Sequence, residues 1–143
     1  MRVPKIVIGL FGIDQHEVGA LAVSSLLRDA GMEIVYAGRY NTPDSLVRIA
    51  VEEDADIIGV SCHSWEYLGY VPELIGLVKS HSPDIAVVLG GSVITATDAR
   101  VMEAAGVAAI FGPGDAPIAI SDSIRRITAA RRRSIRGSFQ GLD

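Results

Sequence analysis

Five short apolar runs, each followed by a stretch with helical character, limit the fold more than any other feature. The runs are "KIVIGL" (5–10), "EIVYAG" (33–38), "DIIGVS" (56–61), "IAVVLGG" (85–91) and "VAAIFG" (107–112). They lack the alternation of apolar and polar residues of a half-exposed strand, and continuous Val and Ile are typical of parallel strands buried on both faces. The helical stretches that alternate with them are 17–30, 43–54, 66–81, 95–105 and 115–131.

Local signals agree with these boundaries. Gly31 is a good stop for the first helix. Thr42 can cap the second helix, and Pro43 fits its first turn. The order βαβαβαβαβα predicts an α/β fold with a parallel sheet and helices on both faces. Five such units favour the flavodoxin-like (Rossmann-like) strand order 2-1-3-4-5, with a ligand outside the carboxyl ends of the first and third strands.

Composition narrows the class of protein. The chain has 143 residues, 49% hydrophobic and 21% charged, which suits one globular domain. A net charge of -4 argues against a general nucleic-acid binder. No run reaches the ~18 apolar residues of a membrane span, and nothing resembles a secretory signal. Cys62 is the single cysteine, so we expect no intrachain disulfide and a soluble cytoplasmic protein without membrane contact.

The C-terminal stretch differs from the rest in charge. Six arginines fall between Arg125 and Arg136 on an otherwise acidic chain. Hydrophobic periodicity fades after Arg131, so we expect a domain over 1–131 and a flexible basic tail over 132–143. The tail is either a solvated end or a segment that docks on an acidic partner surface through Arg131, Arg132 and Arg133.

Polar residues and glycines gather where the predicted strands end. Because the carboxyl ends of parallel strands share one edge of the sheet, these residues are expected on one rim. Glycines there allow a backbone to approach a ligand closely, or simply make tight turns. The candidates are Asp14 and His16 after the first strand, Ser61 and His63 after the third, Gly90 and Gly91 after the fourth, and Gly112 and Gly114 after the fifth.

Three common functions of this fold do not match these residues. A phosphoacceptor receiver domain needs an Asp at the end of the third strand and a Lys after the fifth, where this chain has Ser61 and Gly112-Pro113. A flavodoxin needs a hydroxyl-rich phosphate loop, and "FGIDQHEVG" is not one. The dinucleotide fingerprint G-x-G-x-x-G is absent as well.

The Asp14-x-His16 pair suits one kind of metal chemistry. A neutral imidazole is the commonest metal ligand, and a carboxylate on its other nitrogen orients it. One histidine is too few for an all-protein zinc site, but it suits a metal that brings its own equatorial ligands in a macrocycle. Alone, the pair fits a capping Asp and a surface His as well.

The combination of motifs resembles a known family. "DQHEVG" (14–19) reads D-x-H-x-x-G, followed by Ser61 and by "GG" at 90–91. Over residues 3–128 this resembles the cobalamin-binding domain of adenosylcobalamin-dependent mutases and methionine synthase. The resemblance implies that His16 ligates cobalt with the cofactor base-off and that Asp14 bonds to His16. It also implies a slot for the cofactor's nucleotide tail, lined by Gly19, Ser61, Gly90 and Gly91, and we add Gly112 and Gly114 to the cofactor site.

Within that family, the chain is similar to the small subunit or C-terminal domain of methylmalonyl-CoA and 2-hydroxyisobutyryl-CoA mutases. The similarity rests on "TP" (42–43), "GVS" (59–61), "VPEL" (71–74) and "FGPG" (111–114). It implies an isomerase subunit that binds adenosylcobalamin, contributes no catalytic side chain and needs a larger TIM-barrel subunit carrying the acyl-CoA site. The alternatives are a corrinoid carrier, sensor or methyl-transfer protein, and an interaction module that binds no cobalamin.

Three positions depart from the family pattern. Leu10 stands where a lysine usually bonds to the aspartate, Val18 where an arginine is usual, and His63 where a leucine is usual. His63 is therefore a candidate to contact the tail or the partner, or a plain surface histidine.

Overall fold

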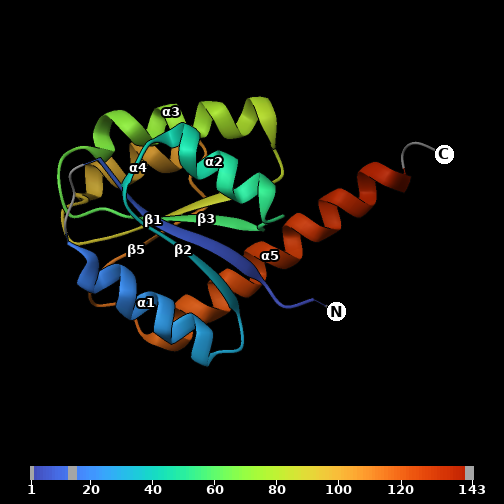
Figure 1. Cartoon of the computed structure of the whole chain (residues 1–143), viewed down its shortest axis with the longest axis horizontal. Helices are drawn as coiled ribbons and strands as arrows, with labels where there is room; N and C mark the ends of the chain where they lie inside the picture. Colours follow the sequence, from blue (N-terminus) through green and yellow to red (C-terminus); the bar gives the residue numbers. More distant parts are fainter. Residues whose placement is uncertain (1, 13–15, 141–143) are drawn as a thin grey trace.

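The five apolar runs form five parallel strands in the order β2-β1-β3-β4-β5, which confirms the predicted topology (Figure 1). The computed structural model describes residues 2–12 and 16–140, with side chains through residue 137. The strands are β1 (Lys5–Phe11), β2 (Glu33–Asn41), β3 (Ile57–Ser61), β4 (Ala86–Gly90) and β5 (Ala109–Phe111). The helices are α1 (Glu17–Asp29), α2 (Pro43–Glu52), α3 (Tyr67–His81), α4 (Ala96–Ala105) and α5 (Pro117–Gln140).

Helices cover both faces of the sheet, which explains why the strands are apolar throughout. Helices α2, α3 and α4 lie on one face, and α1 and α5 lie on the other (Figure 1). A buried cluster fills each face: Val7, Ile58 and Leu89 belong to the first, and Ile6, Ile57 and Val88 to the second. Successive residues of one strand thus point into opposite cores.

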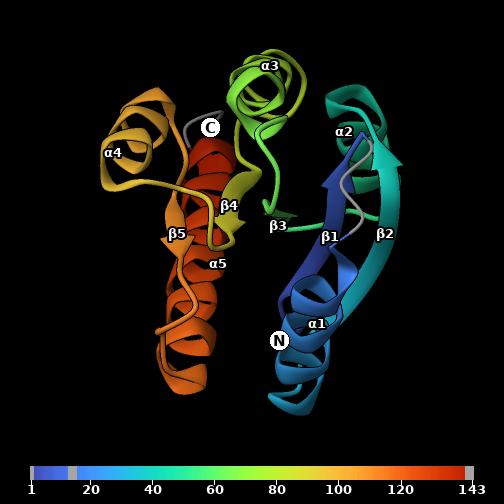
Figure 2. The ribbon, with the colours of Figure 1, turned by 90° about the vertical axis from the view of Figure 1, so that its left-hand side faces the viewer.

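The path of the chain changes direction between β1 and β3. Strand β1 pairs with β2 on one side and with β3 on the other. On the second face, α1 lies next to β1 and β2, while α5 lies next to β4 and β5 (Figure 2). The carboxyl ends of β1 and β3 therefore meet at the switch point, where ligands bind in open α/β sheets.

Helix α2 begins as its sequence predicts. The Thr42 side chain accepts a hydrogen bond from the backbone N–H of Ser45, and the Ser45 hydroxyl accepts one from the N–H of Thr42, with Pro43 in the first turn. Helix α1 ends before Gly31, which takes a left-handed backbone with φ of 90°. Both signals are local, so the sequence alone contains them.

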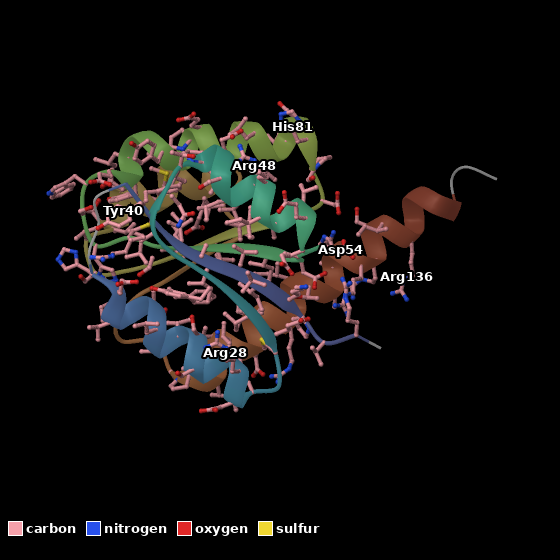
Figure 3. All side chains as sticks on the ribbon, in the orientation of Figure 1. Arg28, Tyr40, Arg48, Asp54, His81 and Arg136 are labelled. Carbon is pink, nitrogen blue, oxygen red and sulfur yellow. The ribbon has the colours of Figure 1, made fainter. Side chains whose placement is uncertain are left out.

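Helix α5 is longer than the sequence predicts. The expected end near Arg131 is wrong, because the helix continues to Gln140 and projects beyond the sheet (Figure 1). Arg136 lies on this projecting part (Figure 3). Arginine is a good helix former. Near residue 131 the helix is also still bonded to the rest of the domain, through Arg131 and Arg132. The division into a domain and a basic tail stays a prediction. No helix in the described part of the chain is long and apolar enough to cross a membrane.

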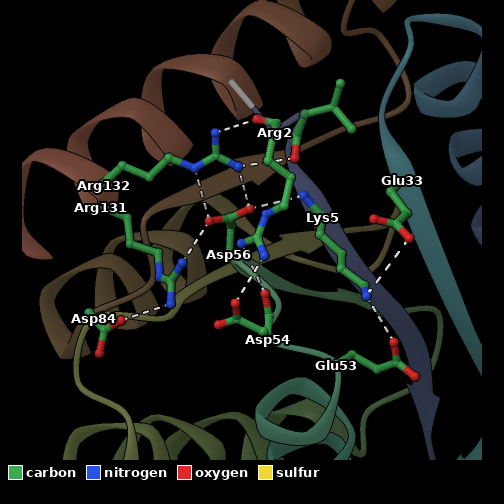
Figure 4. Close-up of polar contacts among 10 residues, drawn as sticks. Arg2, Lys5, Glu33, Glu53, Asp54, Asp56, Asp84, Arg131 and Arg132 are labelled. Carbon is green, nitrogen blue, oxygen red and sulfur yellow. Dashed lines mark hydrogen bonds and ion pairs between the residues drawn. The ribbon is translucent and has the colours of Figure 1, made fainter.

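One contact that holds α5 is an ionic cluster at the amino edge of the sheet, centred on the fully buried Asp56 (Figure 4). The Asp56 carboxylate accepts hydrogen bonds from Arg131 at 2.6 Å, from Arg132 at 3.1 Å and from the backbone N–H of Lys5 at 3.0 Å. Arg131 also pairs with Asp84 at 2.9 Å. We call the contacts of Asp56 with Arg131 and Arg132 the α5 clasp. Arg131 and Arg132 are thus engaged within the chain, although both were candidates for partner docking.

The α5 clasp lowers the pKa of Asp56. Burial by itself raises this pKa, but the hydrogen bonds from Arg132, the Lys5 backbone and Arg131 outweigh it and leave the pKa below its ordinary value. A carboxyl whose pKa is lowered by folding stabilises the fold above its unfolded pKa of ~3.9. That stabilisation is lost as the pH falls through the folded-state pKa.

We expect Asp56→Asn to lower the free energy of unfolding at pH 7 by about 3–5 kcal/mol, because it leaves two arginines beside a buried site without a counter-charge. The matched control is Asp44→Asn, which removes the same charge from an exposed pair with Arg48 and should cost about 0–1 kcal/mol. Urea unfolding measures both. The difference between the parent chain and Asp56→Asn should shrink below pH ~4, and a difference that persists unchanged there would contradict the assignment.

Candidate cofactor-binding site

A cavity of about 240 Å³ lies on the face of the sheet that α1 and α5 cover. Its floor is formed by β1, β3 and β4, and its walls by the two helices. The lining is mainly aliphatic, with Ile6 and Ile8 from β1, Val23 and Leu27 from α1, Val88 from β4, and Ile120 and Ile124 from α5. The cavity therefore lies at the switch point that the strand order defines.

Five of the predicted cofactor-binding residues line this one cavity: Gly19, Ser61, Gly90, Gly91 and Gly112. They come from α1, β3, β4 and the segments that follow β4 and β5, so the fold brings together positions up to 93 residues apart in the chain (19 to 112). Gly114 is not among the lining residues. Asp14 lies outside the described residues, and its role stays a prediction.

Gly59 is a lining residue that the sequence reasoning missed. A Cβ built at this position would lie 3.6 Å from Ile8 Cγ1 and 3.6 Å from Val88 Cγ2, which is ordinary contact distance. A Cβ atom is therefore sterically possible at this position, but a larger side chain would extend from the floor into the cavity. A glycine inside an otherwise apolar strand often marks the close approach of a ligand. The run "DIIGVS" contains this signal.

Gly91 is required by the turn as well as by the cavity. Its φ is +145°, and a Cβ there would overlap the carbonyl oxygen of Cys62. Backbone bonds hold the two segments together, with Cys62 N–H donating to Gly90 O at 2.6 Å. Gly90 is less constrained, since its Cβ would lie 3.7 Å from Phe111 O. Substitution of Gly91 would therefore disturb the fold before it tested a ligand.

Two histidines lie at the carboxyl edge of the sheet. His16 directly precedes α1 and is exposed, and its side chain does not cap the helix. Its ring centroid is 5.8 Å from that of His63, which lines the cavity. Gly19 allows this arrangement, because a Cβ on it would lie only 3.0 Å from His63 Nε2. His16 thus lies outside the cavity and next to one of its walls.

The other departures from the family pattern have clear positions. Leu10 is fully buried in the second apolar cluster, so this position offers no cation to Asp14. Val18 is 83% exposed, pointing away from the cluster. Cys62 is buried in the first cluster, on the other face of the sheet. Of the three departures, His63 alone lines the cavity.

The geometry combines an apolar slot with a polar end. Ser61, His63 and Ser92 follow the carboxyl ends of β3 and β4, and the remaining lining is glycine or apolar. Such a slot suits an apolar ring system whose polar substituent points to the carboxyl edge. An imidazole stands beside that edge. No group of three or more His, Cys, Asp or Glu side chains within residues 2–12 and 16–140 could hold a metal ion.

Comparison with solved structures gives the fold. The chain superposes on a cobalamin-binding protein from Desulfitobacterium hafniense DCB-2 with a TM-score of 0.68, at 17% identity, over 91% of this chain and 58% of that one. It superposes equally well on a response regulator receiver domain from Clostridium thermocellum, with a TM-score of 0.71, at 16% identity, over 91% of this chain and 98% of that one. At these identities the likeness concerns the fold alone.

Comparison with known sequences gives the family. The chain is 35% identical over 127 residues to the 2-hydroxyisobutanoyl-CoA mutase small subunit of Aquincola tertiaricarbonis, covering 89% of this chain and 93% of that one. It is 33% identical over 112 residues to the pivalyl-CoA mutase small subunit of Xanthobacter autotrophicus, covering 78% and 75%. It is 32% identical over 126 residues to the methylmalonyl-CoA mutase of Escherichia coli, covering 88% of this chain and 17% of that one. Residues 4–120 match the B12 binding domain, and the chain belongs to the B12-binding domain family.

Proposed function

We propose that this chain is the cobalamin-binding small subunit of an adenosylcobalamin-dependent acyl-CoA carbon-skeleton mutase. One observation carries the proposal: the apolar cavity of about 240 Å³ is edged by the predicted glycines and has His16 beside its polar end. The proposal is supported by a relative of nearly the same length that is named as a mutase small subunit.

The cavity fits the nucleotide tail of the cofactor. The tail ends in dimethylbenzimidazole, an apolar ring system, and the lining between α1 and α5 is aliphatic. A volume of about 240 Å³ is below the ~300–1,000 Å³ of typical ligand pockets, so the slot suits the tail and leaves the corrin ring outside. Ser61, His63 and Ser92 offer hydrogen-bonding groups toward the polar part of the tail.

His16 is the proposed lower axial ligand of cobalt, with the cofactor bound base-off. With the benzimidazole held in the slot, His16 would supply the imidazole that ligates cobalt in its place. Asp14, two residues earlier, is the proposed partner that orients the ring. Bound adenosylcobalamin supplies the radical that starts the carbon-skeleton rearrangement. The side chains of this subunit bind and orient the cofactor and take no chemical part in the rearrangement.

The proposed partner is a larger TIM-barrel subunit that carries the acyl-CoA site. Two relatives are named as small subunits, and the match to the Escherichia coli mutase covers only 17% of that protein. A domain like this one is therefore part of a much longer mutase chain in one case and a separate subunit in others. We propose that the carboxyl edge, where His16 lies, faces the barrel.

We expect His16→Ala to weaken cobalamin binding by more than the ~10–100-fold that accompanies loss of a partner of a metal ligand. The decisive measurement is electron paramagnetic resonance of the Co(II) form in protein labelled with ¹⁵N-histidine. The ¹⁵N superhyperfine coupling from the labelled histidine should disappear in His16→Ala. It should persist in the control His81→Ala, which alters the histidine at the end of α3 (Figure 3). Coupling that is unchanged in His16→Ala would mean that another group ligates the metal.

We expect Gly59→Val to weaken binding of complete cobalamin by at least ~10-fold, because two methyl groups would occupy the cavity floor, and each 1.4 kcal/mol lost is tenfold. The fold should persist, since the added Cβ meets its neighbours at ordinary contact distances. Gly59→Ala should have a smaller effect. The control ligand is a corrinoid that lacks the nucleotide tail, whose affinity should hardly change. Equal losses for both ligands would argue against the slot.

We expect the purified chain loaded with adenosylcobalamin to show no acyl-CoA isomerisation until a barrel subunit is added. The physical reason is that the proposed tail would occupy the cavity between α1 and α5, so the acyl-CoA is expected to bind on the barrel subunit. Assays with methylmalonyl-CoA and 2-hydroxyisobutyryl-CoA, with and without a barrel subunit, measure this. Turnover by the chain alone would contradict the proposal, and stable binding only to a methyltransferase would favour a corrinoid carrier.

A further inference from the structure

Strand β2 is irregular at its carboxyl end, opposite α1. Its pairing with β1 shifts register between Ile8 and Gly9 and again between Gly9 and Phe11. Gly38 there has φ of 72°, a left-handed conformation that suits glycine. Bulges of this kind redirect side chains and are frequent beside functional sites.

The irregularity brings two β2 side chains to one place. Tyr36 and Arg39 are three positions apart, a spacing that puts side chains on opposite faces of a regular strand. Here both reach Glu17, the first residue of α1. The Tyr36 hydroxyl donates to Glu17 Oε1 at 2.7 Å, and Arg39 Nε lies 3.3 Å from Glu17 Oε2. We call these two contacts the Glu17 clamp.

Three further features stabilise the Glu17 clamp. Burial, together with the hydrogen bond to Glu17, raises the pKa of Tyr36 to about 12, so its hydroxyl remains a donor at neutral pH. The Arg39 guanidinium is further placed over the ring of Tyr40, 5.0 Å from its centroid. A negative charge in the first turn of α1 is also favoured by the helix dipole.

Besides Glu17, the first turn of α1 has one side chain buried against the sheet, that of Ala20. Val18 is 83% exposed, and Gly19 has no side chain. Among the first three residues of the helix, Glu17 alone reaches a strand through its side chain. His16 is the next residue toward the N-terminus, so its backbone position depends on where this turn lies.

We propose that Glu17 is a positioning residue for His16, holding the start of α1 against β2 so that the imidazole meets the corrinoid at a fixed place. The inference rests on the proposed function, because it concerns the same axial ligand. Glu17 touches neither metal nor substrate. Its effect passes through one peptide unit and is a matter of orientation.

The test uses the full chain with added cobalamin and the variants Glu17→Ala, Glu17→Gln and Tyr36→Phe. We expect Glu17→Ala to raise the dissociation constant by about 10–100-fold, the range for groups that orient a metal ligand. Glu17→Gln keeps an acceptor for Tyr36 and should recover most of the affinity. The matched control is Asp44→Ala, which removes another first-turn acid that pairs with an arginine.

Two readouts separate positioning from plain stability. The first is the histidine-nitrogen coupling in the Co(II) form, which should weaken or become heterogeneous in Glu17→Ala and stay unchanged in Asp44→Ala. The second is amide hydrogen exchange in the cobalamin-free chain, which should speed up over residues 16–20 in Glu17→Ala and Tyr36→Phe. The Glu17→Ala, Tyr36→Phe double variant should bind no more weakly than Glu17→Ala, since Glu17→Ala already removes the contact that Tyr36→Phe removes.

The outcomes separate this inference from the proposed function. If the parent chain fails to bind cobalamin, or His16→Ala keeps the parent coupling, the proposed function fails and this inference falls with it. If the parent and His16→Ala behave as expected but Glu17→Ala keeps the parent affinity and coupling, only the role of Glu17 is overturned. The role of Glu17 would also be overturned if Glu17→Ala and Asp44→Ala lost the same affinity, each in proportion to a lowered midpoint of urea unfolding.

Discussion

The cavity depends on a contact at the opposite edge of the sheet, the α5 clasp between Asp56 and two arginines. Ile120 and Ile124 of α5 form one wall of the cavity, while Arg131 and Arg132 fix the same helix to the start of β3. A rigid helix held at one end keeps its other end in place. The buried ion pair, costly as an isolated element, thus helps to hold α5 where it forms one wall of the cavity.

An open slot in the core conflicts with close packing. A void of this size leaves aliphatic side chains without partners and costs stability, and Gly59 adds the cost of glycine in a strand. The chain tolerates both in a core that is otherwise filled on two faces. Gly59 lies in the cavity floor, and Gly91 and Gly38 have positive φ values that glycine adopts readily. Glycine inside a strand, as at Gly59, often marks the close approach of a ligand.

The sequence contained the sheet order, the helix caps and most of the slot, because these follow from local patterns and from the shared edge of parallel strands. Gly59 could have been found from its place inside an apolar run. The Glu17 clamp and the α5 clasp could not, since they join residues 19 and 75 positions apart that no local pattern relates. The length of α5 was missed for the same reason. In the sequence Arg131 and Arg132 look like solvated charges, because only the fold brings Asp56 beside them.

The slot and His16 are held in place by different parts of the structure. Ser61 and Gly90 lie on strands fixed by hydrogen bonds on both sides, so the slot is a property of the sheet. His16 directly precedes α1, and its neighbour Glu17 contacts Tyr36 and Arg39 on β2. On the proposed assignment, residues of the slot would hold the tail and the Glu17 clamp would position the imidazole of His16.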